Sequence, residues 1–377
     1  MPEETATSNA WWDDGGVLLH IGPHKTGTTA LQHSLAAARS QLAEQAIIYP
    51  GKGANHYRAT RERIDGAQER WQQLISEIQA TGQPAIISSE FLDRVDSQLA
   101  PQIIAELGGR VRILITLRPL ATIIPSLWQQ HVKCGTAADL APWTSDLFRR
   151  GPEHVSWRSV DHLGLIRQWQ EIVGDDRVVI LIGDLRDPAR LLRGFEGLAG
   201  INAGTLQLSG RSNRSMTVPE SELALALNRR AADLGITAQQ QIHWVRRGIY
   251  ARTIEERQVM SDEPKLVLPA SVRSDVDAQQ RQVVDLLCSS GSRVVGDPES
   301  LLTGTSNAQQ SGSELAIGAE ELIPVDVAAG MLAALLEKSL AREQEQQRKI
   351  ARLRRKVEKQ KQSQGSQRQH SRWPWRR

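Results

Sequence analysis

The sequence predicts an α/β protein: a central parallel β-sheet flanked by helices, with a helical extension toward the C-terminal end. Two observations support this fold class. Short runs of β-branched and aliphatic residues alternate with longer helix-like stretches through the first two-thirds of the chain. Four of the predicted strands are almost wholly apolar, which suits strands buried on both faces. The predicted strands are Val17–Ile21, Ala46–Tyr49, Ala85–Ser89, Val111–Thr116 and Arg177–Ile182.

Helices are predicted between these strands wherever apolar residues recur with a helical period. Beyond about Gly200 the alternation fades, and Pro219 stands at a position suited to the first turn of a helix. The predicted helices are Thr28–Ala43, Trp71–Thr81, Ala100–Leu107, Ile123–Lys133, Ser159–Ile172, Glu220–Leu234 and Ser274–Ser289.

Composition divides the chain into four segments. Residues 15–302 are predicted to form the main domain, and 303–314, which are small and polar, a linker. The segment 315–360 is predicted to carry one long helix, Val325–Gln360, in which polar residues between Leu340 and Ile350 interrupt the heptad pattern and leave a coiled coil open. The Gln/Ser/Arg-rich residues 361–377 are predicted to be a disordered tail.

Charge is distributed unevenly along the chain. The formal net charge is +3, but residues 342–377 carry 13 Lys/Arg and 3 Asp/Glu, so the remaining residues carry a net charge of −7. The basic character therefore belongs to the C-terminal segment. Cationic segments that contain Trp, here Trp373 and Trp375, can contact anionic membranes or bind nucleic acid without sequence specificity. A solvated tail is the third interpretation.

Cysteine content and hydropathy indicate an intracellular protein. Two cysteines, Cys134 and Cys288, cannot build a disulfide framework, which fits a reducing compartment. The N-terminal residues are acidic and lack the apolar run of a secretory signal. No stretch approaches the roughly 18 consecutive apolar residues of a membrane span. A cytoplasmic location is the expectation.

The most informative segment is VLLHIGPHKTGTTALQHSL, an apolar strand that leads through a Gly-containing turn directly into a helix. This geometry directs backbone N–H groups and a helix N-terminus at an anion. Gly22 and Gly27 allow the tight path, and Thr28 and Thr29 are expected to add hydroxyl donors. A simple strand-to-helix connection, with no ligand, is the alternative.

The turn differs from the P-loop of nucleoside triphosphatases, G-x-x-x-x-G-K-[ST]. Gly22 and Gly27 have the same separation, but Thr28 occupies the lysine position and the lysine stands earlier, at Lys25. The strand Val111–Thr116 is followed by Leu117 and Arg118 rather than by a magnesium-binding aspartate. A P-loop small-molecule kinase is therefore a disfavoured alternative.

A second anion-binding element follows the strand Val111–Thr116. Arg118 stands at the carboxyl end of this strand, where open α/β sheets bind ligands, and Ser126 lies eight residues further on in a predicted helix. An arginine can bind a phosphate through two parallel hydrogen bonds, and the serine can add a hydroxyl.

Together the two segments resemble the sulfotransferases that use 3′-phosphoadenosine 5′-phosphosulfate (PAPS). The segment PHKTGTT resembles their 5′-phosphosulfate loop, and Arg118 with Ser126 resembles their 3′-phosphate pair. The resemblance extends over roughly residues 15–302 and implies a P-loop NTPase-like sulfotransferase fold, with PAPS as donor and no metal. The loop residues that it implies bind the donor are Pro23, His24, Lys25, Thr26, Gly27, Thr28 and Thr29.

The sequence departs from that family near the C-terminal side of the main domain. Small-molecule sulfotransferases have an Arg-Lys-Gly element for the 3′-phosphate, and this sequence has no convincing counterpart. Arg211, Asn213 and Arg214 are candidate substitutes.

The resemblance also implies a mechanism of in-line transfer in which positioning and charge stabilisation contribute most of the catalysis. Lys25 is assigned to the transferring sulfuryl group. Glu90, which follows the strand Ala85–Ser89, is predicted to be the general base, with pairing to Arg94 or Arg118 as the alternative. The rival bases are His20, His24 and His131.

Neither the acceptor nor the oligomeric state can be read from the sequence. The acceptor is expected to be a hydroxyl or amine on a small molecule or glycan (a carbohydrate, lipid or secondary metabolite), contacted by loops at 51–70, 135–157 and 236–265. A specific nucleic-acid ligand is not expected. A non-enzymatic scaffold that keeps a degenerate nucleotide fold is a further alternative.

Overall fold

A computed structural model describes residues 16–183, 187–208, 214–237, 257–259, 263–302 and 325–370. The chain forms two compact units. The first unit draws on residues 1–131, 138–215 and 264–319, and the second on 132–137, 216–263 and 320–377. The predicted main domain, 15–302, therefore contributes residues to both units.

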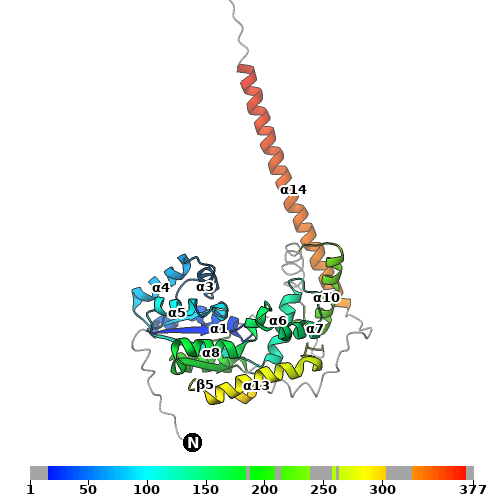
Figure 1. Ribbon diagram of the computed structural model, residues 1–377. Coiled ribbons are helices and arrows are strands. Elements are labelled where there is room, and N and C mark those ends of the chain that lie inside the picture. Colours follow the sequence, from blue (N-terminus) through cyan, green and yellow to red (C-terminus); the bar gives the residue numbers. More distant parts are fainter. Residues whose placement is uncertain are drawn as a thin grey trace, which may run out of the picture. The chain divides into compact units, whose positions relative to one another are not determined.

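The first unit is built on a five-stranded sheet in which every strand pairing is parallel (Figure 1). The strand order is β2-β1-β3-β4-β5, so the chain moves to one side after β1 and to the other side from β3 onward. The predicted α/β class with a central parallel sheet is confirmed. The strands are β1 Val17–Ile21, β2 Ala85–Ser88, β3 Val111–Leu117, β4 Val178–Ile182 and β5 Arg293–Val295.

Two strand assignments differ from the prediction. Residues 46–49 make a single bridge, Ile48 with Ala85, instead of a strand. The backbone of Ala46 is left-handed, with φ 56°, and Pro50 follows directly, so the extended run stays too short to pair further. The edge strand β5 was not predicted, because it is only three residues long and none of them is fully buried.

The helices of the first unit agree with the prediction in place, except that α3, α7 and α9 were not anticipated and Thr28–Ala43 divides at Ala38. The α-helices are α1 Thr28–Ala37, α2 Arg39–Glu44, α3 Tyr57–Ile64, α4 Glu69–Thr81, α5 Leu99–Glu106, α6 Leu120–Val132, α7 Leu140–Arg150, α8 His162–Val173, α9 Pro188–Ala199 and α13 Arg273–Ser289. The short 3₁₀ helices are η1 Glu90–Arg94, η2 Gly151–Glu153, η3 Trp157–Ser159, η4 Asp175–Arg177, η6 Ala270–Val272 and η7 Pro298–Leu301.

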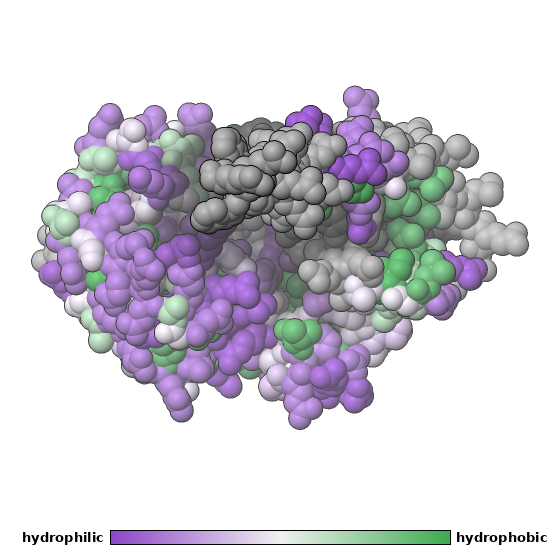
Figure 2. Space-filling model, turned by 90° about the horizontal axis from the view of Figure 1, so that it is seen from above, coloured by the Kyte–Doolittle hydropathy of each residue, from purple (hydrophilic) through white to green (hydrophobic). Residues whose placement is uncertain are grey.

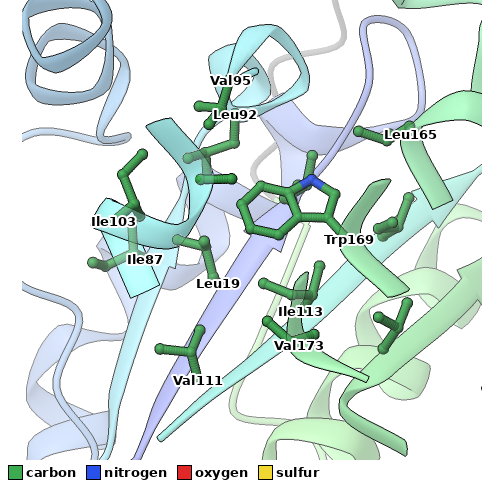
Figure 3. Packing of buried hydrophobic residues seen from close by; sticks show 14 of the residues in the cluster. Leu19, Ile87, Leu92, Val95, Ile103, Val111, Ile113, Leu165, Trp169 and Val173 are labelled. Carbon is green, nitrogen blue, oxygen red and sulfur yellow. The ribbon is translucent and has the colours of Figure 1, made fainter. Parts of the chain in front are cut away.

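Both faces of the sheet are buried, which explains the apolar strands. On one face, alternate strand residues such as Leu19, Ile87 and Ile113 pack against helices that include α4, α5 and α8, with Trp169 among them (Figure 3). On the other face, Leu18 and Leu114 pack against α1, α2 and α9. Hydrophilic residues cover most of the described surface in the view of Figure 2.

The second unit contains α10, Val218–Asp233, and α14, Val325–His370. A capping box joins Thr217 and Glu220 at the start of α10, and Val327 and Met331 of α14 are buried. The last helix continues to His370, so residues 361–370 are helical where a disordered tail was predicted. Their Lys, Gln and Arg residues have good helix propensity, which accounts for the difference. Residues 303–324 and 371–377 lie outside the described residues.

Candidate functional site

The strand order brings the predicted site residues to one edge of the sheet. In an open parallel sheet, ligands bind outside the carboxyl ends of the strands where the strand order reverses, which here is between β1 and β3. The loop 22–27 follows β1, and Arg118 follows β3. Glu90 follows β2, the other neighbour of β1. The three predicted elements therefore leave the carboxyl ends of adjacent strands.

The loop after β1 has a backbone that only certain residues tolerate. Lys25 and Gly27 both have left-handed conformations, with φ 72° and 95°. Lys25 is one of two non-glycine residues with positive φ in the described part of the chain. A Cβ on Gly22 would lie 1.9 Å from the hydroxyl oxygen of Thr28, so this position requires glycine. Such strain at a non-glycine residue is typical of functional loops.

Two of the loop hydroxyls bond within the loop, contrary to the expectation that the Thr28 hydroxyl faces an anion. Thr28 Oγ1 donates to the carbonyl of Gly22 at 3.2 Å. Thr26 Oγ1 donates to the carbonyl of Pro23 at 2.8 Å, and Thr26 is fully buried. These side chains are turned inward because the tight turn leaves carbonyl groups that need donors. They hold the loop in shape.

The N-terminus of α1 is the electropositive end of this loop. Gly27 is the N-cap residue, and no side chain accepts a hydrogen bond from the first-turn amides. The side chains of Lys25 and Thr29 are exposed beside them. An uncapped helix N-terminus with an adjacent lysine can bind a phosphate or sulfate group.

Arg118 connects the end of β3 to this loop. Its Nη1 donates to the carbonyl oxygen of Lys25 at 3.1 Å, across 93 positions of sequence. Ser126 is half-buried in the second turn of α6. The first amide of that helix, on Leu120, donates to the buried side chain of Gln280 at 2.8 Å, which ties α6 to α13.

Glu90 begins η1 and is partly buried. Its carboxylate accepts a hydrogen bond of 3.3 Å from the side-chain amide of Gln32, a buried residue of α1. Glu90 forms no ion pair with another described residue, so pairing with Arg94 or Arg118 is not seen. Arg94 instead lies over the ring of Phe91, 4.6 Å from its centroid.

The three histidines proposed as rival bases lie in different environments. Burial lowers the pKa of His20 to about 3, and the ring bonds to Ser88 and Thr116, so it is a neutral core residue. Burial also lowers the pKa of His24, although the charge of Glu90 opposes this shift. The Nε2 atom of His131 lies 2.7 Å from the hydroxyl oxygen of Ser156, and burial lowers the pKa of this ring as well.

Several site residues gave no signal in the sequence. Gln32, Ser88 and Thr116 lie 56 to 96 positions from their partners, so only the fold brings them together. The candidate residues Arg211 and Asn213 lie outside the described residues, as does most of 236–265. Arg214 donates to the neighbouring carbonyl of Ser215 at 3.3 Å.

Among the described residues, no three His, Cys, Asp or Glu side chains are grouped so that they could hold a metal ion. No described helix combines the length and the hydropathy needed to cross a membrane.

Comparison with known proteins gave one structural likeness. No protein-family model matches the sequence, and no curated protein matches it. The structure is similar to that of a sulfotransferase from Alicyclobacillus acidocaldarius, with 15% sequence identity and a TM-score of 0.38. The likeness covers 59% of this chain and 97% of the other.

Proposed function

We propose that this chain is a sulfotransferase that moves a sulfuryl group from PAPS to a hydroxyl or amine acceptor. The observation that carries the proposal is the 3.1 Å hydrogen bond from Arg118 to the carbonyl of Lys25. It joins two segments, each with its own cationic side chain, at the strand-order reversal where such sheets bind nucleotides.

The donor set at this edge of the sheet fits a nucleotide with two anionic groups. The uncapped amides of α1, with Lys25 and Thr29 exposed beside them, suit the phosphosulfate end. Arg118 and Ser126 are the proposed ligands of the 3′-phosphate. The other loop residues shape the backbone: Pro23, His24, Thr26, Gly27 and Thr28. PAPS, when bound, supplies the sulfuryl group.

The proposed catalytic residues are Lys25 and Glu90. Lys25 neutralises the negative charge that grows on the leaving group, with fixed amides around it, and no metal ion is needed for that task. Glu90 accepts the proton of the attacking hydroxyl or amine. A carboxylate that is partly buried, held by one amide and not ion-paired with any residue that the structure describes can serve as such a base. The acceptor is proposed to be a carbohydrate, a lipid or a secondary metabolite.

Thermal stability with added nucleotide tests the donor site. The product nucleotide 3′-phosphoadenosine 5′-phosphate (PAP), at about 100 times its Kd, should stabilise the fold by about 2.7 kcal/mol and raise the Tm. Arg118→Ala should abolish the shift. Arg110→Ala is the matched control, because Arg110 is exposed just before the opposite end of the same strand, and it should keep the shift.

The remaining outcomes favour other functions. A Tm shift with ATP and magnesium but none with PAP would indicate the kinase alternative. The absence of a shift with either nucleotide would indicate a scaffold.

A further inference from the structure

A buried chain of hydrogen bonds runs from Glu90 to the loop 22–27, the proposed phosphate loop. The amide nitrogen of Gln32 donates to Glu90 Oε2 at 3.3 Å and to Ser88 Oγ at 3.2 Å. Ser88 Oγ lies 2.8 Å from His20 Nδ1, and His20 Nε2 lies 3.0 Å from Thr116 Oγ1. From Thr116 the chain reaches the loop through Thr26 Oγ1 at 3.3 Å.

The direction of these hydrogen bonds can be assigned from one end. A carboxylate only accepts, so Gln32 presents its NH₂ group to Glu90, and the second N–H bonds to Ser88. The Ser88 hydroxyl then donates to His20 Nδ1, which leaves the proton of the neutral ring on Nε2, facing Thr116. Thr116 donates to Thr26, whose own proton goes to the carbonyl of Pro23 at 2.8 Å. Every bond has one donor and one acceptor.

The chain is isolated from solvent and spans six structural elements. Its members between Glu90 and Pro23 are at most 1% exposed, and Phe195 of α9 packs against the His20 ring, with centroids 5.6 Å apart. Hydrogen bonds in such a setting are strong and reinforce one another. The Gln32 amide is therefore held by groups that have little freedom to rearrange.

We propose that Gln32 is the positioning residue for Glu90, and that the chain through Ser88, His20 and Thr116 fixes the orientation of the Gln32 amide. This inference rests on the proposed function, since it requires Glu90 to be the base. Gln32 acts through Glu90 and does not itself touch the reacting atoms. The donor site remains separate, because Lys25, Thr29 and Arg118 do not belong to the chain.

Gln32→Met tests the proposal, because methionine is similar in size and unbranched but has no N–H donor. We expect kcat to fall about tenfold, less than the roughly 10²–10⁴-fold of a lost general base, while the KM for PAPS and the Tm shift with PAP stay unchanged. Ser34→Ala is the matched control. Ser34 is also buried on α1, but its hydroxyl donates to the carbonyl of Gln207, away from Glu90, so kcat should not change.

A double-mutant cycle separates positioning from a general structural role. If Gln32 acts only through Glu90, then Gln32→Met should lower kcat in the wild type but add nothing to Glu90→Gln. Equal, additive losses in both backgrounds would overturn the proposal. Ser88→Ala gives a second test if Gln32→Met folds poorly: it removes one acceptor of the Gln32 amide and should lower kcat a few-fold. If the wild type shows neither a PAP shift nor sulfuryl transfer, the proposed function fails and the inference fails with it.

A separate observation concerns the second unit. Residues 341–356 of α14 are exposed without exception and carry seven Lys/Arg against two Glu. Arg348, Arg352 and Arg355 share one side of the helix at i, i+4 and i+7 spacing. Ile350 and Leu353, three residues apart, lie on the opposite side of the helix from these arginines, flanked by Lys349, Arg354 and Lys356, and they are 50% and 60% exposed.

We infer that this part of α14 binds an anionic membrane surface. Parallel pairing with a second copy of the helix would place like charges together, which disfavours a dimer. Two exposed aliphatic side chains flanked by Lys349, Arg354 and Lys356 suit a lipid interface, whereas the phosphates of a nucleic acid need only the cations.

Vesicle co-sedimentation tests this inference with the full chain. We expect binding to vesicles of phosphatidylcholine with phosphatidylglycerol and none to phosphatidylcholine alone. Changing Lys349, Arg354 and Lys356 to Gln should weaken binding on the order of 10²-fold, from about fivefold per cation. The same change at the exposed Arg110, Arg149 and Arg167 is the control. Equal binding to neutral vesicles, unchanged binding of the α14 variant, or tighter binding to an oligonucleotide would overturn it.

Discussion

Two neighbouring buried regions of the first unit differ in whether their polar side chains are hydrogen-bonded. Under the phosphate loop, His20, Ser88 and Thr116 are linked through both ring nitrogens and both hydroxyls. Where η1 packs near α8, Asp93, His162 and Trp169 are as deeply buried, but their polar side-chain atoms bond to no other described residue. The difference indicates that the first region holds a defined geometry, whereas the second keeps its titratable groups uncharged at a cost in stability.

Burial shifts the pKa values of the titratable groups in both regions, but with different consequences. Burial raises the pKa of Asp93 to about 7, against a smaller opposing contribution from the charge of Arg94, and lowers the pKa of His162 to about 4. His20 is neutral as well, but its neutral ring has one donor and one acceptor, which match its two partners. Catalytic geometry is therefore expected to depend on the first region and pH-dependent stability on both.

The largest effect is expected at the end of the paired region. Glu90→Gln should lower kcat by about 10²–10⁴-fold with little change in Tm, because it removes the proposed base and keeps the shape of the side chain. Steady-state kinetics with PAPS and a screen of hydroxyl and amine acceptors would measure it. Near-normal turnover would eliminate Glu90 as the base and leave its bond to Gln32 without a catalytic purpose.

Removing the centre of the hydrogen-bond chain should reduce stability. His20→Leu leaves the Ser88 and Thr116 hydroxyls without their partner, at a cost of about 1–3 kcal/mol in the free energy of unfolding. Chemical denaturation at pH 7 would measure the loss. His33→Leu is the control: His33 is exposed on α1, and its replacement should change stability by less than about 0.5 kcal/mol. A similar loss in both variants would mean that the chain adds no stability.

Asp93→Asn should stabilise the protein only above about pH 3.8. The folded chain keeps a proton on Asp93 up to about pH 7, whereas the unfolded chain releases it near 3.8, so the wild type loses stability as pH rises through this window. The variant should therefore have a higher Tm at pH 8 and an unchanged Tm below pH 3.8.

In the Asp93→Asn variant, the buried histidines should contribute a loss of stability as the pH is lowered. The unfolded chain protonates them near pH 6.5, and the folded chain resists protonation of His20 to about pH 3 and of His162 to about pH 4. Stability should then fall as pH is lowered from about 6.5. The Tm difference between Asp93→Asn and the wild type should be larger at pH 8 than at pH 3.5. The opposite order would contradict this assignment.

The smallest expected effect compares two tryptophans. Trp71 and Trp169 are both 0% exposed, but Trp71 Nε1 donates to Glu106 at 2.7 Å, and Trp169 Nε1 bonds to no described residue. Trp71→Phe should therefore cost about 1 kcal/mol more than Trp169→Phe, because it removes one donor from the Glu106 carboxylate, which Arg63 still binds. Equal losses in the free energy of unfolding would show that Trp169 Nε1 also has a hydrogen-bond acceptor in solution.

Local patterns in the sequence were enough for the fold class and for the backbone of the site. The apolar runs of β1, β2, β3 and β4, the glycines of the phosphate loop and the start of α1 depend on residues close together in the chain. The exposed position of Lys25 and the place of Arg118 after β3 follow from the same local order. Where local signals were short or mixed, as at β5 and at 46–49, the prediction was incomplete or wrong.

The sequence by itself thus determined the strand–loop–helix unit of the candidate site, since period, glycine positions and helix starts are local properties. The tertiary structure alone decided the strand order β2-β1-β3, which places His20 between Ser88 and Thr116. It also decided that the hydroxyls of Thr26 and Thr28 turn inward and that Gln32 reaches Glu90. The physical reason is that the bonds of Gln32 and His20 join side chains 56 to 96 positions apart, and no short-range pattern encodes a contact over that separation.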